Sequence, residues 1–168
     1  MIALWGALAV VIMTGCSEGK PANPITPTSS PTQAPSPLSI TLSSKEGALI
    51  SAQDLVSAEF KNVGLEPLRL YKYKLLPAVC IRIRSGDGSS LPRVFAPMPA
   101  PFREDDVLNL EVGKSWALNF KVKDLILTDP KGLHVVLQCI YDTSMGYSGE
   151  FKIWRGESKS NQLEVSIK

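Results

Sequence analysis

The sequence predicts an all-β protein whose body folds as an antiparallel sandwich of about seven strands. The main observation is that apolar and polar residues alternate with a period of two, which places one set of side chains on the buried face of a sheet. Turn-forming residues separate these runs, and the body shows no convincing helical periodicity. Residues 38–168 are of the usual size for one domain.

The alternation is clearest in four runs, which we expect to be strands. They are residues 56–61, 116–123, 135–142 and 163–168. Shorter candidate strands are residues 38–43, 68–75, 79–84 and 151–154. Residues 44–55 are ambiguous, because they could contain a helical turn. Turn signals such as Asn62-Val63-Gly64, Ser85-Gly86-Asp87-Gly88 and Asp129-Pro130-Lys131-Gly132 fall between these runs.

The first residues, MIALWGALAVVIMTGC, do not follow this pattern. Residues 2–13 carry no charge and are too few for a comfortable membrane span of ~20 residues, but they match the ~7–15 residues of a signal-peptide core. The ending Met13-Thr14-Gly15-Cys16 resembles the lipobox of bacterial lipoproteins. This resemblance implies that residues 1–15 are a signal peptide, that cleavage precedes Cys16, and that Cys16 receives the lipid. The alternative is a buried apolar element with an incidental cysteine.

Residues 16–37 predict a disordered tether between the lipid and the body. Residues 17–37 contain six prolines among Ser, Thr and Ala, with Ile25 as the only large aliphatic side chain. In extended polyproline form this stretch reaches at most ~65 Å, so we expect a stalk. Docking of the stalk into an aromatic-lined groove is an alternative. Ser17 is not the Asp that lipoprotein families associate with inner-membrane retention, which favours the outer membrane if the organism is Gram-negative.

The body resembles bacterial immunoglobulin-like modules, including the intracellular proteinase-inhibitor-like family. The motifs that carry this resemblance are F-K-N-V-G, P-L-R-L, S-G-D-G, L-E-V-G-K-S, P-K-G-L-H-V and S-N-Q-L-E-V-S-I. The resemblance covers residues 38–168 and implies an immunoglobulin-like β-sandwich. Because the motifs are mostly turn chemistry, they say more about the fold than about the function. The chain lacks the Cys…Trp…Cys arrangement of antibody domains.

Cys80 and Cys139 are the two cysteines of the body and form a candidate disulfide, because an exported protein meets an oxidising compartment. Both are expected on strands. The strand pattern places Val79, Ile81 and Ile83 inward, so Cys80 should face away from the core while Cys139 faces into it. This parity argues against the disulfide, and two buried free thiols are the favoured alternative.

No set of residues points to catalysis, a metal or a cofactor. His134 is the only histidine and has no catalytic motif beside it, which disfavours a small hydrolase. Gly113-Lys114-Ser115 imitates part of a phosphate-binding loop, but position 108 is Leu where that motif needs Gly. The acidic cluster of residues 104–106 offers only part of a Ca²⁺ ligand set. With 18 basic and 16 acidic residues and no basic stripe, nucleic acid is not an expected partner.

The loop of residues 95–102 is the candidate site of protein contact. Three prolines stiffen it, and exposed apolar groups on a rigid loop suit a binding surface. The candidate contact residues are Phe95, Pro97, Met98, Pro99, Pro101 and Phe102. Alternatively, the loop folds over the open end of the sandwich and buries Phe95 and Phe102. The nearby arginines 82, 84, 93 and 103 could attract an anionic partner or simply solvate the surface.

These observations favour a non-enzymatic, lipid-anchored binding or structural module of a bacterial cell envelope. Its expected partners are the membrane, through the lipid on Cys16, and a protein that the sequence does not identify. An inhibitor or regulator of a protease or other envelope enzyme is the alternative function, resting on the family resemblance and the proline-rich loop.

Overall fold

Three β-sheets make up the computed structural model, which describes residues 35–96, 102–144 and 151–168. The strands of these residues are β1 (Leu38–Ser44), β2 (Leu49–Ile50), β3 (Leu55–Asn62), β4 (Leu68–Tyr71), β5 (Ile81–Ser85), β6 (Val107–Leu110), β7 (Ser115–Lys121), β8 (His134–Asp142) and β9 (Glu157–Ile167). The short helices are η1 (Lys72–Leu75), α1 (Pro77–Cys80), η2 (Glu104–Asp106) and η3 (Val122–Asp124). Among the described helices, none is long and apolar enough to cross a bilayer. The predicted all-β sandwich is confirmed.

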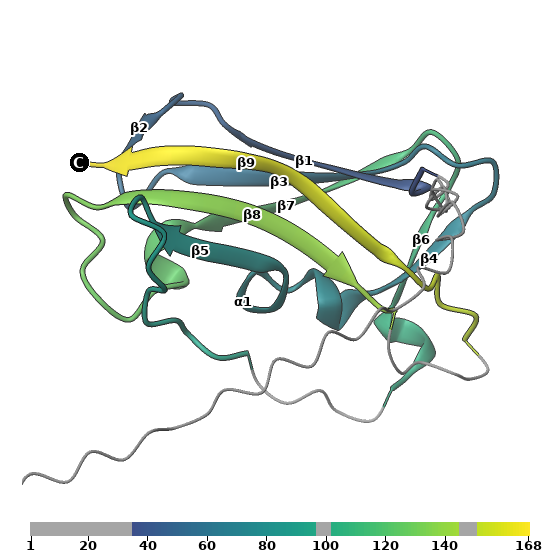
Figure 1. Cartoon of the computed structure of the whole chain (residues 1–168). Helices are drawn as coiled ribbons and strands as arrows, with labels where there is room; N and C mark the ends of the chain where they lie inside the picture. Colours follow the sequence, from purple (N-terminus) through teal and green to yellow (C-terminus); the bar gives the residue numbers. More distant parts are fainter. Residues whose placement is uncertain (1–34, 97–101, 145–150) are drawn as a thin grey trace, which may run out of the picture. The chain divides into compact units, whose positions relative to one another are not determined.

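The sandwich consists of two facing sheets and a small ribbon (Figure 1). One sheet has the strand order β1-β3-β7, the other has the order β2-β9-β8-β5, and β4 pairs with β6. All pairs are antiparallel except β2 with β9. The orders β1-β3-β7 and β5-β8-β9 correspond to A-B-E and C-F-G of an immunoglobulin-type sandwich. In that fold strand D lies beside E, whereas here β6, which comes before β7 in the chain, pairs with β4.

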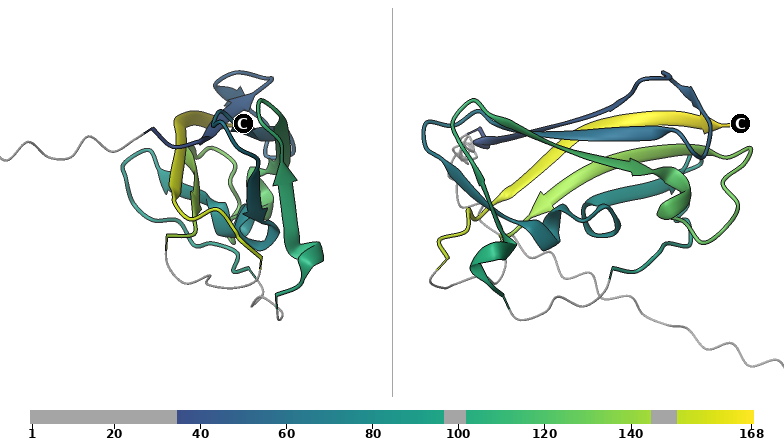
Figure 2. Two further views of the ribbon diagram at one scale, coloured as in Figure 1. Left: turned by 90° about the vertical axis from the view of Figure 1, so that its right-hand side faces the viewer. Right: turned by 180° about the vertical axis from the view of Figure 1, so that it is seen from behind.

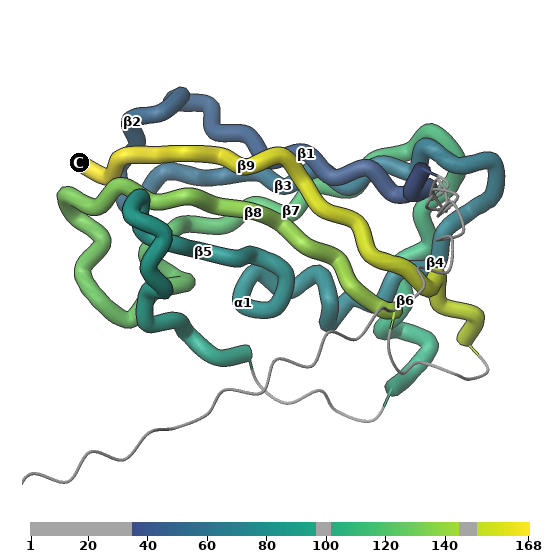
Figure 3. The backbone as a smooth tube through the Cα atoms, in the orientation of Figure 1, coloured from purple at the N-terminus to yellow at the C-terminus, as the bar shows by residue number. Residues whose placement is uncertain are grey.

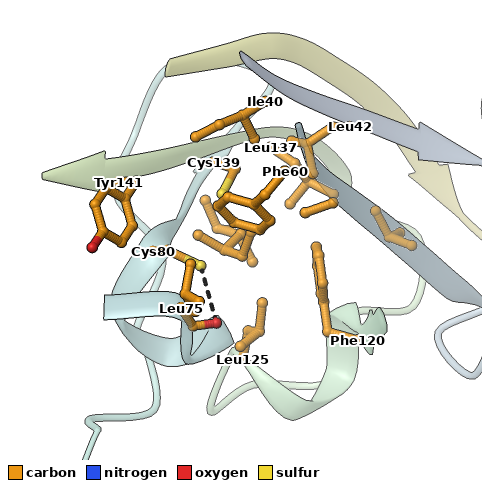
Figure 4. Close-up of a cluster of buried hydrophobic side chains, with 14 of the residues drawn as sticks. Ile40, Leu42, Phe60, Leu75, Cys80, Phe120, Leu125, Leu137, Cys139 and Tyr141 are labelled. Carbon is orange, nitrogen blue, oxygen red and sulfur yellow. Dashed lines mark hydrogen bonds between the residues drawn. The ribbon is translucent and has the colours of Figure 1, made fainter. Parts of the chain in front are cut away.

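The core lies between the two facing sheets (Figure 4). Strand register places Ile40, Phe60 and Trp116 side by side on the inner face of one sheet. Leu137 and Cys139 face them from β8, and both are fully buried. The alternation of apolar and polar residues in the sequence therefore predicts correctly which side chains face the core from both sheets.

Three of the shorter predicted strands differ from the structure. Residues 68–75 form a strand only as far as Tyr71, and η1 follows it. Within residues 79–84 the strand begins at Ile81, because α1 begins at Pro77. Proline has no backbone N–H for a sheet and suits the first turn of a helix. Residues 151–154 are not a strand, and the ambiguous residues 44–55 hold a turn and the two-residue strand β2 rather than a helical turn.

A buried asparagine organises the crossing from the β3–β7 pair to the β4–β6 ribbon. The Asn62 side-chain amide donates hydrogen bonds to the carbonyls of Glu66 (2.8 Å) and Leu110 (2.9 Å). Its Oδ1 accepts a hydrogen bond from the backbone N–H of Gly64 at 2.9 Å. The Asn62 carbonyl accepts from the N–H of Gly113, whose φ of 73° is favourable for glycine. Asn62 thus satisfies backbone groups of both segments inside the protein.

The two ends of the body are well separated along the sandwich (Figure 3). The C-terminus lies beside β2, at the end away from the β4–β6 ribbon. β1 begins at the ribbon end, where Val63 donates its N–H to the carbonyl of Pro37 at 2.8 Å.

Candidate protein-contact site

The segment that enters the candidate loop is tied to the sandwich by Arg93. Its guanidinium Nη2 donates to the carbonyl of Ala78 within α1 (3.2 Å) and to that of Ile81 at the start of β5 (2.5 Å). Burial, with a smaller effect from nearby Arg82, lowers the pKa of Arg93. The next residue, Val94, donates its N–H to the carbonyl of Leu125 at 3.0 Å. These bonds fix the backbone immediately before Phe95.

The two phenylalanines of the loop have different surroundings. Phe95 is 89% exposed, which makes it the most exposed aromatic side chain among the large apolar residues described. Phe102 is half-buried, with its ring centroid 4.5 Å from that of Tyr71 and 4.5 Å from that of Phe151. Phe95 therefore offers a contact surface. Phe102 instead packs in a small aromatic cluster, in line with the alternative in which the loop folds over the sandwich and buries it. Pro97, Met98, Pro99 and Pro101 lie outside the described residues.

The segment that leaves the loop is held by the acidic cluster 104–106. The Asp106 carboxylate accepts a hydrogen bond from the backbone N–H of Arg103 at 2.8 Å, and Glu104 forms an ion pair with Arg69. Lys72 donates from Nζ to the carbonyl of Asp105 at 2.6 Å. The Glu104–Arg69 pair thus holds the η2 turn against β4, and the Lys72–Asp105 bond holds it against η1, while Asp106 bonds within its own turn. Within the described part of the chain, no group of three or more His, Cys, Asp or Glu side chains is arranged to hold a metal ion.

The nearby arginines do not act as one anion-binding group. Arg82 and Arg84 are both exposed on the solvent face of β5, as alternate residues of a strand must be. Arg93 directs its guanidinium to the carbonyls described above, and exposed Arg103 lies just before η2. Of these four arginines, only Arg82 and Arg84 therefore share one exposed strand face.

Cys80 and Cys139 meet in the core, which the expected strand parity did not predict. Cys80 is the last residue of α1 and not part of a strand, so that expectation was wrong for it. Both cysteines are free and fully buried, and the Cys80 thiol lies 3.7 Å from the carbonyl oxygen of Leu75 (Figure 4). A hydrogen bond with Cys80, together with burial, raises the pKa of the Cys139 thiol strongly. The thiols pack as small apolar groups in this structure, and the disulfide stays a prediction.

His134 lies on an open sheet face beside a serine and a glutamate. Its Nδ1 is 3.2 Å from Ser166 Oγ, and its Nε2 is 3.9 Å from Glu164 Oε2. A Cβ at Gly86 would lie 2.2 Å from the imidazole Cδ2, so a larger residue there would displace the ring. About half of the His134 side-chain surface is exposed, so water reaches the three polar groups freely. This setting lacks the water-excluded environment that strengthens electrostatic catalysis.

Comparison with other proteins adds no family assignment. No protein-family model matches the chain, and neither does any curated protein.

Proposed function

We propose that the protein is a lipid-anchored lipoprotein of a bacterial cell envelope, and that its sandwich is a non-enzymatic, immunoglobulin-like binding module. The lipobox ending at Cys16 and the proline-rich tether support the anchored location. The observation that carries the binding role is the exposure of Phe95 on a loop that begins at a fixed point of the sandwich.

An exposed phenylalanine in this position is suited to protein binding. Burying such a side chain in a partner contributes on the order of 1.5–3 kcal/mol, and aromatic residues commonly dominate binding energy. The hydrogen bonds of Arg93 and Val94 order the backbone before binding, which lowers the entropic cost of association. The partner we infer is a protein with an apolar pocket for one aromatic ring.

The anchor is tested by the intact mass of the full chain extracted from membranes. The expected mass corresponds to residues 16–168 plus acyl chains, and Cys16→Ala should remove the acyl addition. A wild-type mass that still includes residues 1–15, without acyl chains, would contradict the lipoprotein assignment.

The binding role is tested by placing a photo-crosslinking amino acid at Phe95 of the full chain in its own cells. The matched control is Leu55, an apolar residue that is also exposed but lies at the start of β3. We expect a discrete protein adduct from position 95 and none from position 55. The same adducts from both positions, or none from either, would contradict Phe95 as a contact residue.

Inhibition of a protease or another envelope enzyme is the second candidate function. It is favoured by the attachment of both loop ends, through Arg93 at one side and Phe102 at the other. An inhibitor should reduce the activity of a co-purifying protease, and Phe95→Asp should relieve that inhibition while leaving the fold intact. A Phe95 adduct to a protein whose activity is unchanged would favour the binding module over the inhibitor.

A further inference from the structure

Within residues 35–96, 102–144 and 151–168, the outer edge of β7 has no neighbouring strand. All seven residues of β7 pair with β3 on one side, and the register runs from Leu55–Lys121 to Lys61–Ser115 without a shift. In the described residues, no strand and no hydrogen bond reaches the opposite side of β7. Such an edge presents a row of backbone N–H and C=O groups that can pair with another strand. Figure 2 shows β7 from behind the sandwich.

The other long strand edges are closed by side chains or turns. On β1, the Asn161 amide bonds to both the N–H (2.8 Å) and the carbonyl (3.1 Å) of Leu42, as a neighbouring strand would. On β5, Arg93 bonds to the carbonyl of Ile81, and Ser85 donates its N–H to the carbonyl of Ser89. The remaining edge strand of the large sheet, β2, has only two residues. Among the edges of the two facing sheets, β7 is therefore the long one left open in the described residues.

The side chains of β7 leave apolar surface at this edge. Trp116 and Leu118 face the interior but are only half-buried, whereas their cross-strand partners Phe60 and Ala58 are fully buried. The strand has no proline, and Lys121 at its end is its only charge. These are the features of an edge that accepts another strand, because proteins usually protect such edges with charges, prolines or bulges.

We propose that β7 pairs antiparallel with β7 of a second copy of this chain, which joins the two β1-β3-β7 sheets into one continuous sheet. A two-fold axis at Leu118 generates a self-complementary interface. In that register Trp116 lies opposite Phe120 of the second copy, and Leu118 lies opposite Leu118. All of these side chains are on the inner face, so the interface gains two aromatic cross-strand pairs.

The inner-face residues of β7 favour this occupant, and its single charge does not oppose it. Centred on Leu118, the pairing sets Lys121 opposite Ser115 of the second copy, so no like charges are opposed. On the outer face it sets exposed Ala117 opposite exposed Asn119, which are small enough to pair without a clash. The apolar inner-face residues of the strand thus match their own reversed sequence, and Lys121 meets no opposing charge on β7 of the second copy.

The test compares two double variants of the full chain that differ only in the sign of the charge at residue 119. In Ala117→Lys/Asn119→Lys, the proposed register opposes two lysine pairs across the interface, whereas Ala117→Lys/Asn119→Glu opposes two lysine–glutamate pairs. Both variants keep the same lysine beside Glu59 and place residue 119 beside Ser57, and both sites are exposed, so the fold should tolerate them equally. Light scattering of the detergent-solubilised chain, corrected for detergent, gives the molar mass of the protein.

We expect dimers for the parent chain and for the lysine–glutamate variant, and at least roughly tenfold weaker association for the two-lysine variant. A monomeric parent at about 100 µM, or equal association of both variants, would overturn the proposal.

Thiol crosslinking supplies a second measurement, independent of detergent-corrected mass. Ala117→Cys/Asn119→Cys should form a covalent homodimer with a short bismaleimide in membranes, and the parent chain corrects for native thiols. The matched control is Thr41→Cys/Ser43→Cys on the exposed face of β1, whose edge Asn161 closes. A crosslink from β7 to a different protein, or equal homodimer from both strands, would overturn pairing with a second copy. Neither outcome depends on Phe95 or on lipidation of Cys16.

Discussion

Replacing Asn62 by alanine tests whether one buried side chain holds the crossing between the main sheet and the β4–β6 ribbon. The substitution removes three side-chain hydrogen bonds, to Glu66, Leu110 and Gly64. At about 1 kcal/mol net for each bond, and with a further cost because the bond to the Leu110 carbonyl is buried, the expected loss is about 3–5 kcal/mol. This is a large part of the ~5–15 kcal/mol by which domains are stable.

Urea denaturation followed by tryptophan fluorescence measures this loss. With a urea dependence of about 1–3 kcal/mol per molar, the midpoint should fall by at least ~1 M. Asn109→Ala is the matched control, because Asn109 is exposed on β6 and should cost less than ~0.5 kcal/mol. A loss below ~1 kcal/mol for Asn62→Ala, or one equal to that of the control, would refute the role assigned to this side chain.

Three further predictions follow from the described contacts. Phe102→Ala should lower the free energy of unfolding by about 2 kcal/mol in a thermal or urea melt, because it breaks two aromatic contacts. Phe95→Ala should lower it by under ~0.5 kcal/mol, and equal losses for the two variants would contradict the different burial of the two side chains. The folded pKa of Cys139 is raised, so above pH ~8.5 the native state keeps a proton that the unfolded state releases. The free energy of unfolding should therefore fall by up to ~1.4 kcal/mol per pH unit above that pH. Cys139→Ala should flatten this fall, and an unchanged pH profile of stability in the variant would count against the buried thiol. Asn161→Ala should cost about 1–2 kcal/mol and speed hydrogen exchange at the Leu42 amide; unchanged exchange would show that Asn161 does not close the β1 edge.

The strands that the sequence predicts well are those with strict alternation next to clear turn residues. The predicted run 135–142 becomes β8 with inward residues at 135, 137, 139 and 141, as expected. The strands missed were β2 and β6, because runs of two and four residues are too short to show a period. The run 151–154 has the composition of a strand but is not one, since composition alone does not supply a partner strand.

The candidate site was only partly predictable. The sequence marked Phe95 and Phe102 as a pair, but their difference in exposure depends on Tyr71 and Phe151, which are distant in the chain. The sequence left two alternatives for Arg93, contact with an anionic partner or simple solvation of the surface, whereas its folded partners are backbone carbonyls. Pro77 was the overlooked signal for α1, and it explains why Cys80 turns toward Cys139 against the expected parity.

Local chemistry sets the class of fold, because the two-residue period that buries one face of a strand is written in neighbouring residues. The apolar leader ending in Cys16 and the proline-rich stretch are local signals of the same kind, and they support the proposed anchor. Strand pairing, by contrast, depends on contacts between distant residues, so only the folded chain shows that β6 pairs with β4 instead of β7. Among the described residues, that choice leaves the edge of β7 open, while Asn161, far along the chain from Leu42, closes the edge of β1. A local sequence pattern cannot predict which edges are open, because a strand edge is open only when no other strand or side chain of the folded chain pairs with it.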